Sequence, residues 1–306
     1  MMTHTQMATE GRIPFAVGDE TFETYYKLFG DIASCPASDG PLVVLHGGPG
    51  ITHDYLIPLS DLACRSTPRA VIFYDQLGNG RSTRLPGKDP TFWTIDLFIA
   101  ELENLLAFFR ITDCFNVLGH SWGGTLVSEF VVRRQPHGLR RLVLSSALAS
   151  AKLRNEAIGR LRPGLPDDVQ ASLKKHEAAG SIKSEEYKAA MMVFYAKHAC
   201  RLQPFPPEFL YSINHAEKDP TVLDAMRNGS AGLGARWDVT DRIHLMRHIP
   251  TLLINGEYDY MTDSVCAPFY LGIDRVKWVK FAQSSHSPHW EERERYMGVV
   301  GGFLDG

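Results

Sequence analysis

The feature that most constrains this chain is the segment GHSWGG at residues 119–124, which separates an apolar run from an amphipathic one. The run before it, FNVL, is typical of a buried strand, and residues 124–135 carry apolar side chains at helical spacing. Glycines two residues before and two residues after Ser121 form the G-x-S-x-G pattern of a serine on a sharp strand-to-helix turn. Such a turn strains the serine backbone and leaves no room for side chains at the two glycines. We therefore interpret Ser121 as a catalytic nucleophile rather than as part of an ordinary glycine-rich turn.

Short apolar runs typical of buried strands recur on both sides of a central stretch of different character. Before residue 149 they include PLVVL, RAVIFYD, CFNVLG and LRRLVLSS, and from residue 249 they are IPTLLING and RVKWVKF. Residues 21–28 alternate like a half-exposed strand, and residues 95–110 and 124–135 have the spacing of covering helices. Strands covered on both faces and alternating with helices predict an α/β fold with a mostly parallel, doubly wound sheet.

Residues 150–240 interrupt this alternation with several helical segments that begin at acidic or serine signals and stop at glycine or proline. We expect one core domain, made of residues 1–149 and 241–306, with residues 150–240 inserted as a helical cap. A second independent domain is the alternative, but it is less economical because both ends of the stretch return to one sheet. The first dozen residues are expected to be a loose end.

Bulk properties exclude several classes of partner. The net charge is −3 and the pI is near 6.5, with no dense run of Lys and Arg, so a nucleic-acid partner is not expected. No apolar run reaches about 18 residues and the start lacks a secretory layout, so we expect no membrane segment and a cytoplasmic protein. Five scattered cysteines predict buried free thiols rather than disulfides or metal ligands. The sequence leaves the oligomeric state open.

A serine nucleophile needs a histidine base, which is itself oriented by a carboxylate. In the strand–turn–helix context of G-x-S-x-G, these partners follow the serine along the chain, acid before base. Asp259 follows the strand-like run TLLINGEY, and His286 follows VKWVKF through AQSS. His289 is the competing base and Asp263 is the weaker competitor for the acid.

Acyl transfer also needs donors for a developing oxyanion. The N–H of Trp122, directly after the nucleophile, is one candidate. The loop LHGGPG at residues 45–50 offers the other, and we assign it to Gly48; a plain glycine turn after a strand is the alternative. The tract YDQLGNGRS, with Asp75 and Gln76, suits a tight turn packed beneath that loop more than it suits chemistry. Because the chain has neither a G-x-G-x-x-G motif after its first strand nor a phosphate loop with lysine, we expect no nucleotide cofactor.

The segments LHGGPG, YDQLGNGRS, GHSWGG, GEYD and SSHSPHWEERERY occur in this order and together resemble the proline iminopeptidase family of α/β-hydrolases, including its L-amino-acid amidase relatives. The resemblance covers residues 22–304. It implies an α/β-hydrolase fold and a serine hydrolase without metal or cofactor. Such an enzyme forms an acyl-enzyme and releases an N-terminal residue, often proline, or cleaves small amino-acid amides. It also implies a triad and an oxyanion hole, and it favours His286 over His289; the residues are Ser121, Asp259 and His286, with Gly48 and Trp122.

The chain departs from this family at the positions that hold a free amine. Family aminopeptidases carry an acid directly after the triad aspartate and another in the cap. Here Tyr260 stands at the first position, and glycine or alanine replaces the acid within residues 228–238. An ammonium group that leaves water without a carboxylate partner loses several kcal/mol of binding free energy. Other cap acids could compensate, namely Glu156, Glu208 or Glu217.

These departures keep two alternatives open beside the amidase or peptidase hypothesis. One is a pathway-specific esterase, lactonase or acyltransferase that has lost free-amine recognition, and the other is a non-catalytic relative that only binds a ligand. In each case we expect a small molecule or short peptide in the pocket. Candidate substrate-binding residues are Tyr260, Gly47, Phe194 and Tyr195, and further aromatic candidates are Phe205, Phe209 and Tyr211.

Overall fold

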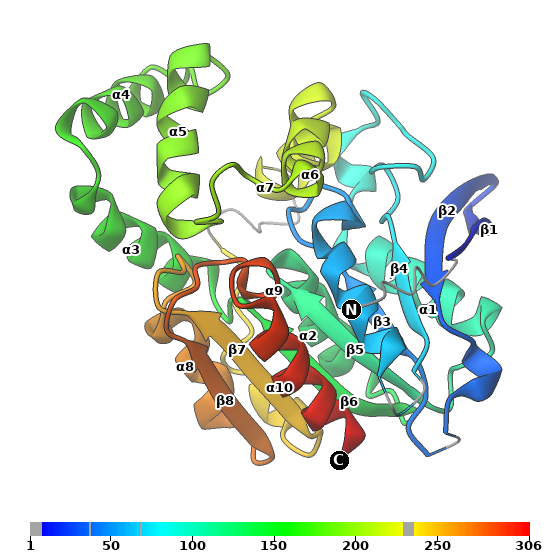
Figure 1. Ribbon diagram of the computed structural model, residues 1–306. Coiled ribbons are helices and arrows are strands. Elements are labelled where there is room, and N and C mark those ends of the chain that lie inside the picture. The colour runs from blue at the N-terminus through cyan, green and yellow to red at the C-terminus, as the bar shows by residue number, and fades with distance from the viewer. Residues whose placement is uncertain (1–7, 37, 66, 68, 229–235) are drawn as a thin grey trace.

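The computed structural model describes residues 8–36, 38–65, 67, 69–228 and 236–306, and one sheet organises them. Eight strands lie in the order β1-β2-β4-β3-β5-β6-β7-β8. The pairs β1–β2 and β2–β4 are antiparallel and the other pairs are parallel (Figure 1). The predicted α/β fold with a mostly parallel sheet is confirmed. The strand bounds are β1 Thr9–Val17, β2 Glu20–Phe29, β3 Leu42–Leu45, β4 Val71–Tyr74, β5 Phe115–His120, β6 Leu139–Ser145, β7 Thr251–Gly256 and β8 Val276–Phe281.

The expectation of a loose N-terminal dozen is wrong from Thr9 onward. Strand β1 begins there and pairs with β2 along its whole length, which buries Ile13 and Phe15. Gly11 and Pro14 hide its strand pattern in the sequence, and an edge strand tolerates proline because one side of it has no partner. Residues 1–7 lie outside the described residues.

Two buried apolar clusters cover the two faces of the sheet. On one face lie α1 (Ile95–Phe108), α2 (Trp122–Arg134) and α8 (Asp263–Gly272), and on the other lie η2 (His53–Cys64) and α10 (Arg293–Asp305). Successive residues of β3 divide between the clusters, since Val43 and Leu45 join the first while Leu42 and Val44 join the second. Burial on both faces explains why this strand reads as a continuous apolar run.

Five α-helices of the described residues, here called the cap helices, lie between β6 and β7 in the chain. Figure 1 shows them to one side of the sheet, beyond the carboxyl ends of the parallel strands. The two ends of this insertion meet, since Ser150 forms a bridge with Asp238 and the Ala151 N–H donates to Trp237 O at 2.8 Å. The bounds are α3 Ala151–Leu161, α4 Asp167–Ala178, α5 Glu185–His198, α6 Pro207–Lys218 and α7 Thr221–Asn228.

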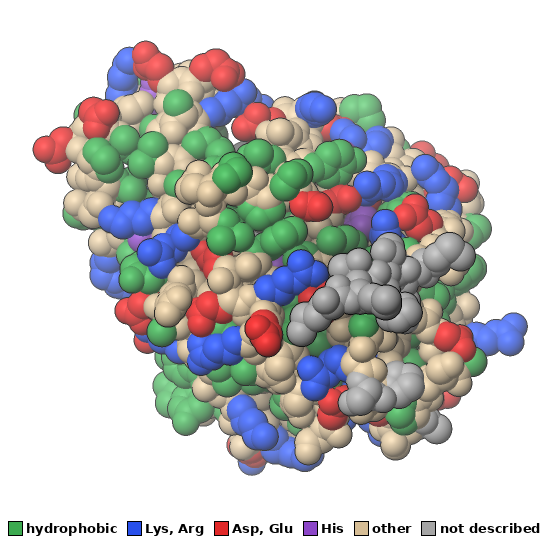
Figure 2. Space-filling view, in the orientation of Figure 1, with side chains coloured by type: hydrophobic (Ala, Val, Ile, Leu, Met, Phe, Trp, Pro, Cys, Tyr) green, Lys and Arg blue, Asp and Glu red, His purple; other side chains and the backbone are tan. Residues whose placement is uncertain are grey.

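Helix α6 joins the cap to the core through polar contacts. The Ser212 hydroxyl lies 2.9 Å from Thr52 Oγ1 and accepts from the Tyr55 N–H at 3.1 Å. The Gly80 N–H donates to His215 Nε2 at 2.9 Å. Apolar side chains gather between the cap helices in Figure 2.

The remaining short helices connect the larger elements. Their bounds are η1 Ile32–Ser34, η3 Pro90–Phe92, η4 Arg162–Gly164, η5 Ile243–Met246 and α9 Pro288–Glu291. All five cysteines are described and none forms a disulfide, as predicted, but only Cys200 and Cys266 are buried while Cys64 is exposed. Among the described helices, none combines the length and apolar character that a bilayer crossing requires.

Candidate active site

Ser121 lies on the turn between β5 and α2 with φ 55° and ψ −117°, a strained conformation for a residue with a side chain. The turn is held by the Ser121 N–H, which donates to Ser145 O at 3.0 Å. A Cβ on Gly119 would fall on the carbonyl oxygen of Gly123, and one on Gly123 would fall on that of Leu45. The two glycines are therefore required because the backbones of neighbouring segments pass in contact with the turn.

Asp259 and His286 lie on the loops after β7 and β8 and form a buried pair. The distance from His286 Nδ1 to Asp259 Oδ1 is 2.8 Å, and the same oxygen accepts from the Met261 N–H at 2.8 Å. Because the carboxylate accepts at Nδ1, the neutral ring carries its proton there and presents Nε2 as an acceptor. His286 lines a cavity that Ser121 also lines.

Tyr260 takes a position that the sequence analysis did not foresee. Its hydroxyl lies 2.9 Å from His286 Nε2 and its ring stacks on the imidazole with centroids 4.2 Å apart. The hydroxyl also interacts with the Ser121 side chain, and burial raises the pKa of Tyr260, so the phenol is protonated and donates. Among the described hydrogen bonds, none joins Ser121 directly to His286. Tyr260 therefore donates to His286 Nε2, the nitrogen that would have to accept the Ser121 proton if His286 were the base.

The two competing residues lie apart from this arrangement. His289 is fully buried, and its Nε2 lies 3.0 Å from the Tyr55 carbonyl oxygen. Burial lowers the pKa of His289 to about 3. Asp263 accepts from Asn255 Nδ2 at 2.9 Å and from Lys280 Nζ at 2.9 Å. The structure thus brings together Asp259 and His286 but neither of their competitors.

A chain of three hydrogen bonds ties the loops of the site together. The Gly47 N–H donates to the Tyr55 hydroxyl at 2.8 Å, that hydroxyl lies 2.7 Å from His120 Nδ1, and His120 Nε2 lies 2.8 Å from the His286 carbonyl oxygen. Burial lowers the pKa of His120, so a neutral ring accepts from Tyr55 and donates to the carbonyl. Sequence reasoning missed both roles. The position of His120 directly before Ser121 in the motif was a usable signal, whereas nothing in the sequence marked Tyr55.

Two backbone N–H groups beside Ser121 are available as oxyanion donors. The Gly47 N–H is engaged by Tyr55, whereas the described hydrogen bonds contain no acceptor for the N–H of Gly48 or Trp122. Gly48 and Trp122 both line a cavity at Ser121. The Trp122 indole donates to Gln76 Oε1 at 2.8 Å, and the Gln76 N–H donates to His46 Nε2 at 3.0 Å, so Gln76 supports the loop from below.

Comparison with known proteins places this chain in a family. A family model described as alpha/beta hydrolase fold matches residues 40–293. The proline iminopeptidase of Saccharolobus solfataricus is 35% identical over 92% of this chain and 88% of its own, and that of Lactobacillus delbrueckii subsp. bulgaricus is 33% identical over 97% of each. The solved structure of proline iminopeptidase from Mycobacterium smegmatis is 38% identical, covers 97% of this chain and 98% of its own, and has a TM-score of 0.83.

The chain belongs to the proline iminopeptidase family of α/β-hydrolases. It is a serine hydrolase of the proline iminopeptidase type. A solved protein named VinJ is also similar, at 39% identity and a TM-score of 0.87 over 96% of this chain and 98% of that one.

In this member of the proline iminopeptidase family, two cavities of about 360 Å³ each meet at Ser121. We call the first the arginine cavity; among its lining residues are Gly48, Trp122, Arg154, Arg162, Phe194 and Arg227. We call the second the apolar cavity after Ile51, Met192, Phe209, Ile213 and Leu223; its lining also includes His286 and the charged residues Lys183, Lys188, Glu217 and Asp224. Tyr195, Arg227 and Tyr260 line both cavities.

The predicted pocket residues divide between these cavities. Phe194 lines the arginine cavity, and Gly47 and Phe209 line the apolar cavity, but Phe205 and Tyr211 line neither. Of the three cap acids, Glu217 lines the apolar cavity, whereas Glu156 and Glu208 line neither. Of the stretch 228–238, residues 229–235 lie outside the described residues.

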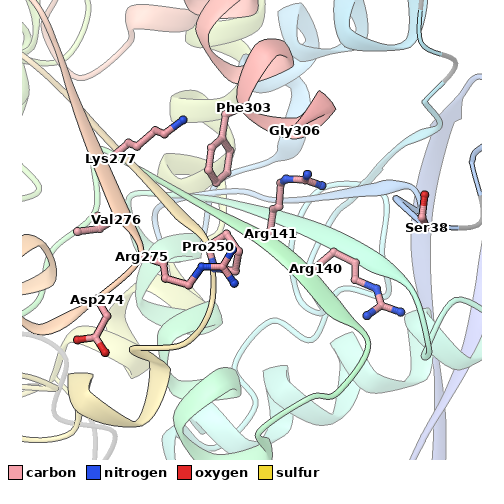
Figure 3. A pocket seen from close by; sticks show the side chains of 10 residues that line it. All are labelled: Ser38, Arg140, Arg141, Pro250, Asp274, Arg275, Val276, Lys277, Phe303 and Gly306. Carbon is pink, nitrogen blue, oxygen red and sulfur yellow. The ribbon is translucent and has the colours of Figure 1, made fainter.

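A larger cavity, of about 690 Å³, lies at the other end of the sheet (Figure 3). Its lining includes Arg140 and Arg141 at the start of β6, Pro250 just before β7 and Val276 at the start of β8. These are the amino ends of parallel strands, whereas Ser121, Asp259 and His286 follow the carboxyl ends. Ligands of open α/β sheets bind at the carboxyl ends, so the larger cavity lies at the end of the sheet where such ligands do not bind.

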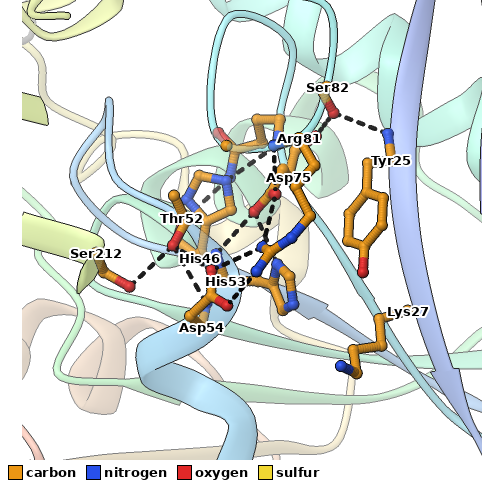
Figure 4. A network of polar contacts seen from close by, with 12 residues as sticks. Tyr25, Lys27, His46, Thr52, His53, Asp54, Asp75, Arg81, Ser82 and Ser212 are labelled. Atoms are coloured by element: carbon orange, nitrogen blue, oxygen red, sulfur yellow. Dashed lines mark hydrogen bonds and ion pairs between the residues drawn. The ribbon is translucent and has the colours of Figure 1, made fainter. Parts of the chain in front are cut away.

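A polar network beside the loop at residues 45–50 contains three candidate metal ligands (Figure 4). His53, Asp54 and Asp75 each offer a ligand atom, and these atoms lie within 4.8 Å of one another. The Arg81 guanidinium donates to both oxygens of Asp54 at 3.0 and 2.9 Å, and the Arg81 N–H donates to Asp75 at 2.9 Å. An arginine thus supplies the positive charge that a metal ion would bring, and we interpret the cluster as structural.

Proposed function

We propose that this hydrolase of the proline iminopeptidase type cleaves a small amide or short peptide through an acyl-enzyme on Ser121, with His286 as base and Asp259 as its orienting carboxylate. The observation that carries the proposal is the buried Asp259–His286 pair, since His286 lines a cavity that Ser121 also lines. Membership of the family supports the same assignment.

The proposed reaction has two halves. His286 Nε2 takes the proton of the Ser121 hydroxyl as Oγ attacks the substrate carbonyl carbon. The resulting oxyanion accepts hydrogen bonds from the N–H groups of Gly48 and Trp122. His286 then gives its proton to the leaving nitrogen, the C–N bond breaks, and water repeats the same steps to release the acid and restore Ser121. Asp259 stabilises the charged imidazole that forms in each half.

The Tyr260 hydroxyl must move away from His286 Nε2 before the first step. Its hydroxyl donates to the same nitrogen that has to accept the Ser121 proton. A rotation of the tyrosine, driven by substrate entering the cavities that it lines, frees that nitrogen. We therefore assign Tyr260 a positioning role rather than a chemical one.

Hydrolysis without recognition of a free amine is the second candidate function. It is favoured by the residue after Asp259, which is a neutral phenol, and by the lining of the arginine cavity, which contains no Asp or Glu within the described residues. An ester, lactone or N-blocked amide would need no carboxylate partner, and the same triad would cleave it.

Active-site labelling tests the proposal. A fluorophosphonate should modify Ser121, Ser121→Ala should remove both labelling and turnover, and Ser287→Ala should retain both. Ser287 is a matched control because it also lines the apolar cavity. Labelling of another residue, or turnover by Ser121→Ala, would refute the assignment of Ser121. If the wild-type protein binds substrate but shows neither labelling nor turnover, the result would support a non-catalytic relative.

A paired substrate comparison then separates the two candidate functions. An aminoacyl 4-nitroanilide and its N-acetyl derivative differ in the free amine alone. Equal rates would favour hydrolysis without amine recognition, whereas a strong preference for the free amine would favour peptidase chemistry.

A further inference from the structure

The charge of the arginine cavity is opposite to the charge that would bind a free amine. Arg154 on α3, Arg162 on η4 and Arg227 on α7 line it, and its lining residues within the described chain include no Asp or Glu. Arg162 is balanced locally, because both of its terminal nitrogens donate to the Glu177 carboxylate. The net positive charge of the lining therefore comes from Arg154 and Arg227.

No carboxylate elsewhere in the chain reverses this charge. Residues 229–235, outside the described part, read GSAGLGA and contain no acid, and neither do the other undescribed positions. Asp224 and Glu217 line the apolar cavity, which Arg227 also lines, and neither acid lines the arginine cavity; Asp224 accepts from Lys183 Nζ at 3.0 Å. The described structure thus includes every acid of the chain.

Arg154 lines the same cavity as Ser121 and Tyr260. It interacts electrostatically with Tyr260, whose hydroxyl touches Ser121 and His286. Its guanidinium donates to the uncharged Asn155 Oδ1 at 3.2 and 3.0 Å. Burial and the like charge of Arg227 lower the pKa of Arg154, which is the direction expected where a bound anion would be stabilising.

The catalytic groups indicate which part of the substrate enters which cavity. His286, which must protonate the leaving group, lines the apolar cavity and is absent from the lining of the arginine cavity. Trp122, one of the two oxyanion donors, lines the arginine cavity. The acyl group therefore extends into the arginine cavity, and the leaving group lies among the apolar side chains.

We infer that the acyl group of the substrate carries a carboxylate, which Arg154 and Arg227 bind in the arginine cavity while an apolar amine occupies the other cavity. The inference rests on the proposed acyl transfer to Ser121. The substrate class is the half-amide of a short dicarboxylic acid. Water cleaves its amide bond to give a dicarboxylate and a free amine. Arginine suits this role because its planar fork matches both oxygens of a carboxylate.

Three 4-nitroanilides that differ in charge test the inference. Glutaryl 4-nitroanilide carries the carboxylate, its terminal carboxamide has the same size without charge, and prolyl 4-nitroanilide carries a cation. We expect kcat/KM for the glutaryl compound to exceed that for the carboxamide by on the order of 10- to 100-fold. Arg154→Gln should remove this preference, because it should lower kcat/KM for the glutaryl compound about tenfold or more relative to that for the carboxamide.

Arg160→Gln is the matched control on the same helix. Arg160 donates to Ser264 Oγ at 3.0 Å and does not line the arginine cavity, so the preference should persist. Arg227→Gln provides a second test at an exposed residue, in case Arg154→Gln does not fold. Glutarate should also protect wild-type Ser121 from fluorophosphonate more strongly than its monoamide does, a readout that requires no turnover.

The possible outcomes separate this inference from the proposed function. Equal kcat/KM for the charged and uncharged acyl groups, faster cleavage of the prolyl compound, or equal protection by glutarate and its monoamide would overturn the carboxylate site. An equal loss for both acyl groups in Arg154→Gln would mean a structural role and would overturn it as well. Failure of Ser121 to react with fluorophosphonate would instead refute the proposed function.

Discussion

The described residues contain two buried His–Asp pairs of almost the same geometry, and only one of these histidines lines a cavity that Ser121 also lines. His286 Nδ1 lies 2.8 Å from Asp259, and His53 Nδ1 lies 2.7 Å from Asp75. Both aspartates are almost completely buried, with 1% and 0% of their surface exposed. The pairs differ in what surrounds the imidazole.

His286 lines a cavity that Ser121 also lines, and the Tyr260 hydroxyl lies 2.9 Å from its Nε2. The His53 ring packs against Tyr25 and Phe73, with centroids 5.7 and 5.9 Å away. Asp75 is further held by the Arg81 N–H (Figure 4). A buried His–Asp pair is therefore not by itself a catalytic signature, because reactivity depends on access to the second nitrogen.

The largest expected effect comes from breaking the pair at the site. Asp259→Asn should reduce kcat by about 10³- to 10⁴-fold, because an amide favours the imidazole tautomer whose proton is on the wrong nitrogen. Folding should be little affected, since the amide oxygen still accepts from the Met261 N–H. Steady-state kinetics and thermal melting measure the two effects. A loss of less than tenfold would contradict the role of Asp259.

The second prediction breaks the other pair. Asp75 accepts from the backbone and ring of His53 and from the Arg81 N–H, and an asparagine has only one oxygen to offer. Asp75→Asn should lower the free energy of unfolding by about 3 kcal/mol, while kcat of the folded enzyme stays within about threefold. Asp61→Asn, which breaks an exposed ion pair with Arg293, should cost under about 1 kcal/mol in the same denaturant titration. A fall in kcat without loss of stability would mean that the His53–Asp75 pair acts in catalysis rather than in folding.

His289 contrasts with both His–Asp pairs, because it is buried and the described hydrogen bonds of its ring include no carboxylate. The pKa of His289 is lowered to about 3 in the folded chain. Below pH about 6.5 this histidine therefore binds a proton in the unfolded chain but stays neutral in the folded chain. His289 therefore has no effect on stability at higher pH and contributes a loss of up to about 1.4 kcal/mol per unit as pH drops from 6.5 towards 3. Burial also lowers the pKa of His120, so His289→Gln should make the slope shallower by about that amount without removing it, as urea titrations at pH 7, 6 and 5.5 would detect. Equal slopes in both proteins would contradict the prediction.

The smallest expected effect concerns the group that covers His286. Tyr260→Phe removes the hydroxyl that donates to Nε2, so fluorophosphonate should label Ser121 about 2- to 10-fold faster. Tyr258→Phe, at an exposed tyrosine on the same loop, should leave the second-order rate constant of labelling unchanged. Slower labelling of Tyr260→Phe would mean that the hydroxyl assists proton transfer rather than blocking it.

Sequence reasoning succeeded where a contact is local or follows from chain order. The turn at Ser121 could be predicted because its glycines stand two residues away on either side. Asp259 and His286 could be named because parallel strands bring their following loops to one edge of the sheet. The edge strand β1 was missed because an edge strand can tolerate the glycine and proline that obscure its pattern.

Contacts between distant segments were not foreseen. Tyr260 is next to Asp259 in the chain, yet its hydroxyl reaches His286, 26 residues later. Tyr55 and His120 are 65 residues apart and meet through a hydrogen bond of 2.7 Å. Neither side chain shows a periodicity or motif that reports its partner, so only the folded backbone could bring them together.

The sequence alone determined the α/β fold, the strained serine turn and the order of acid and base, because apolar periodicity and glycine sterics act over a few residues. The tertiary structure alone decided which of two His–Asp pairs faces a cavity, which side chain covers the outer nitrogen of His286, and which charge lines the pocket. These outcomes depend on how the cap helices and the strand ends pack around Ser121, and such packing is set by contacts between residues far apart in the chain.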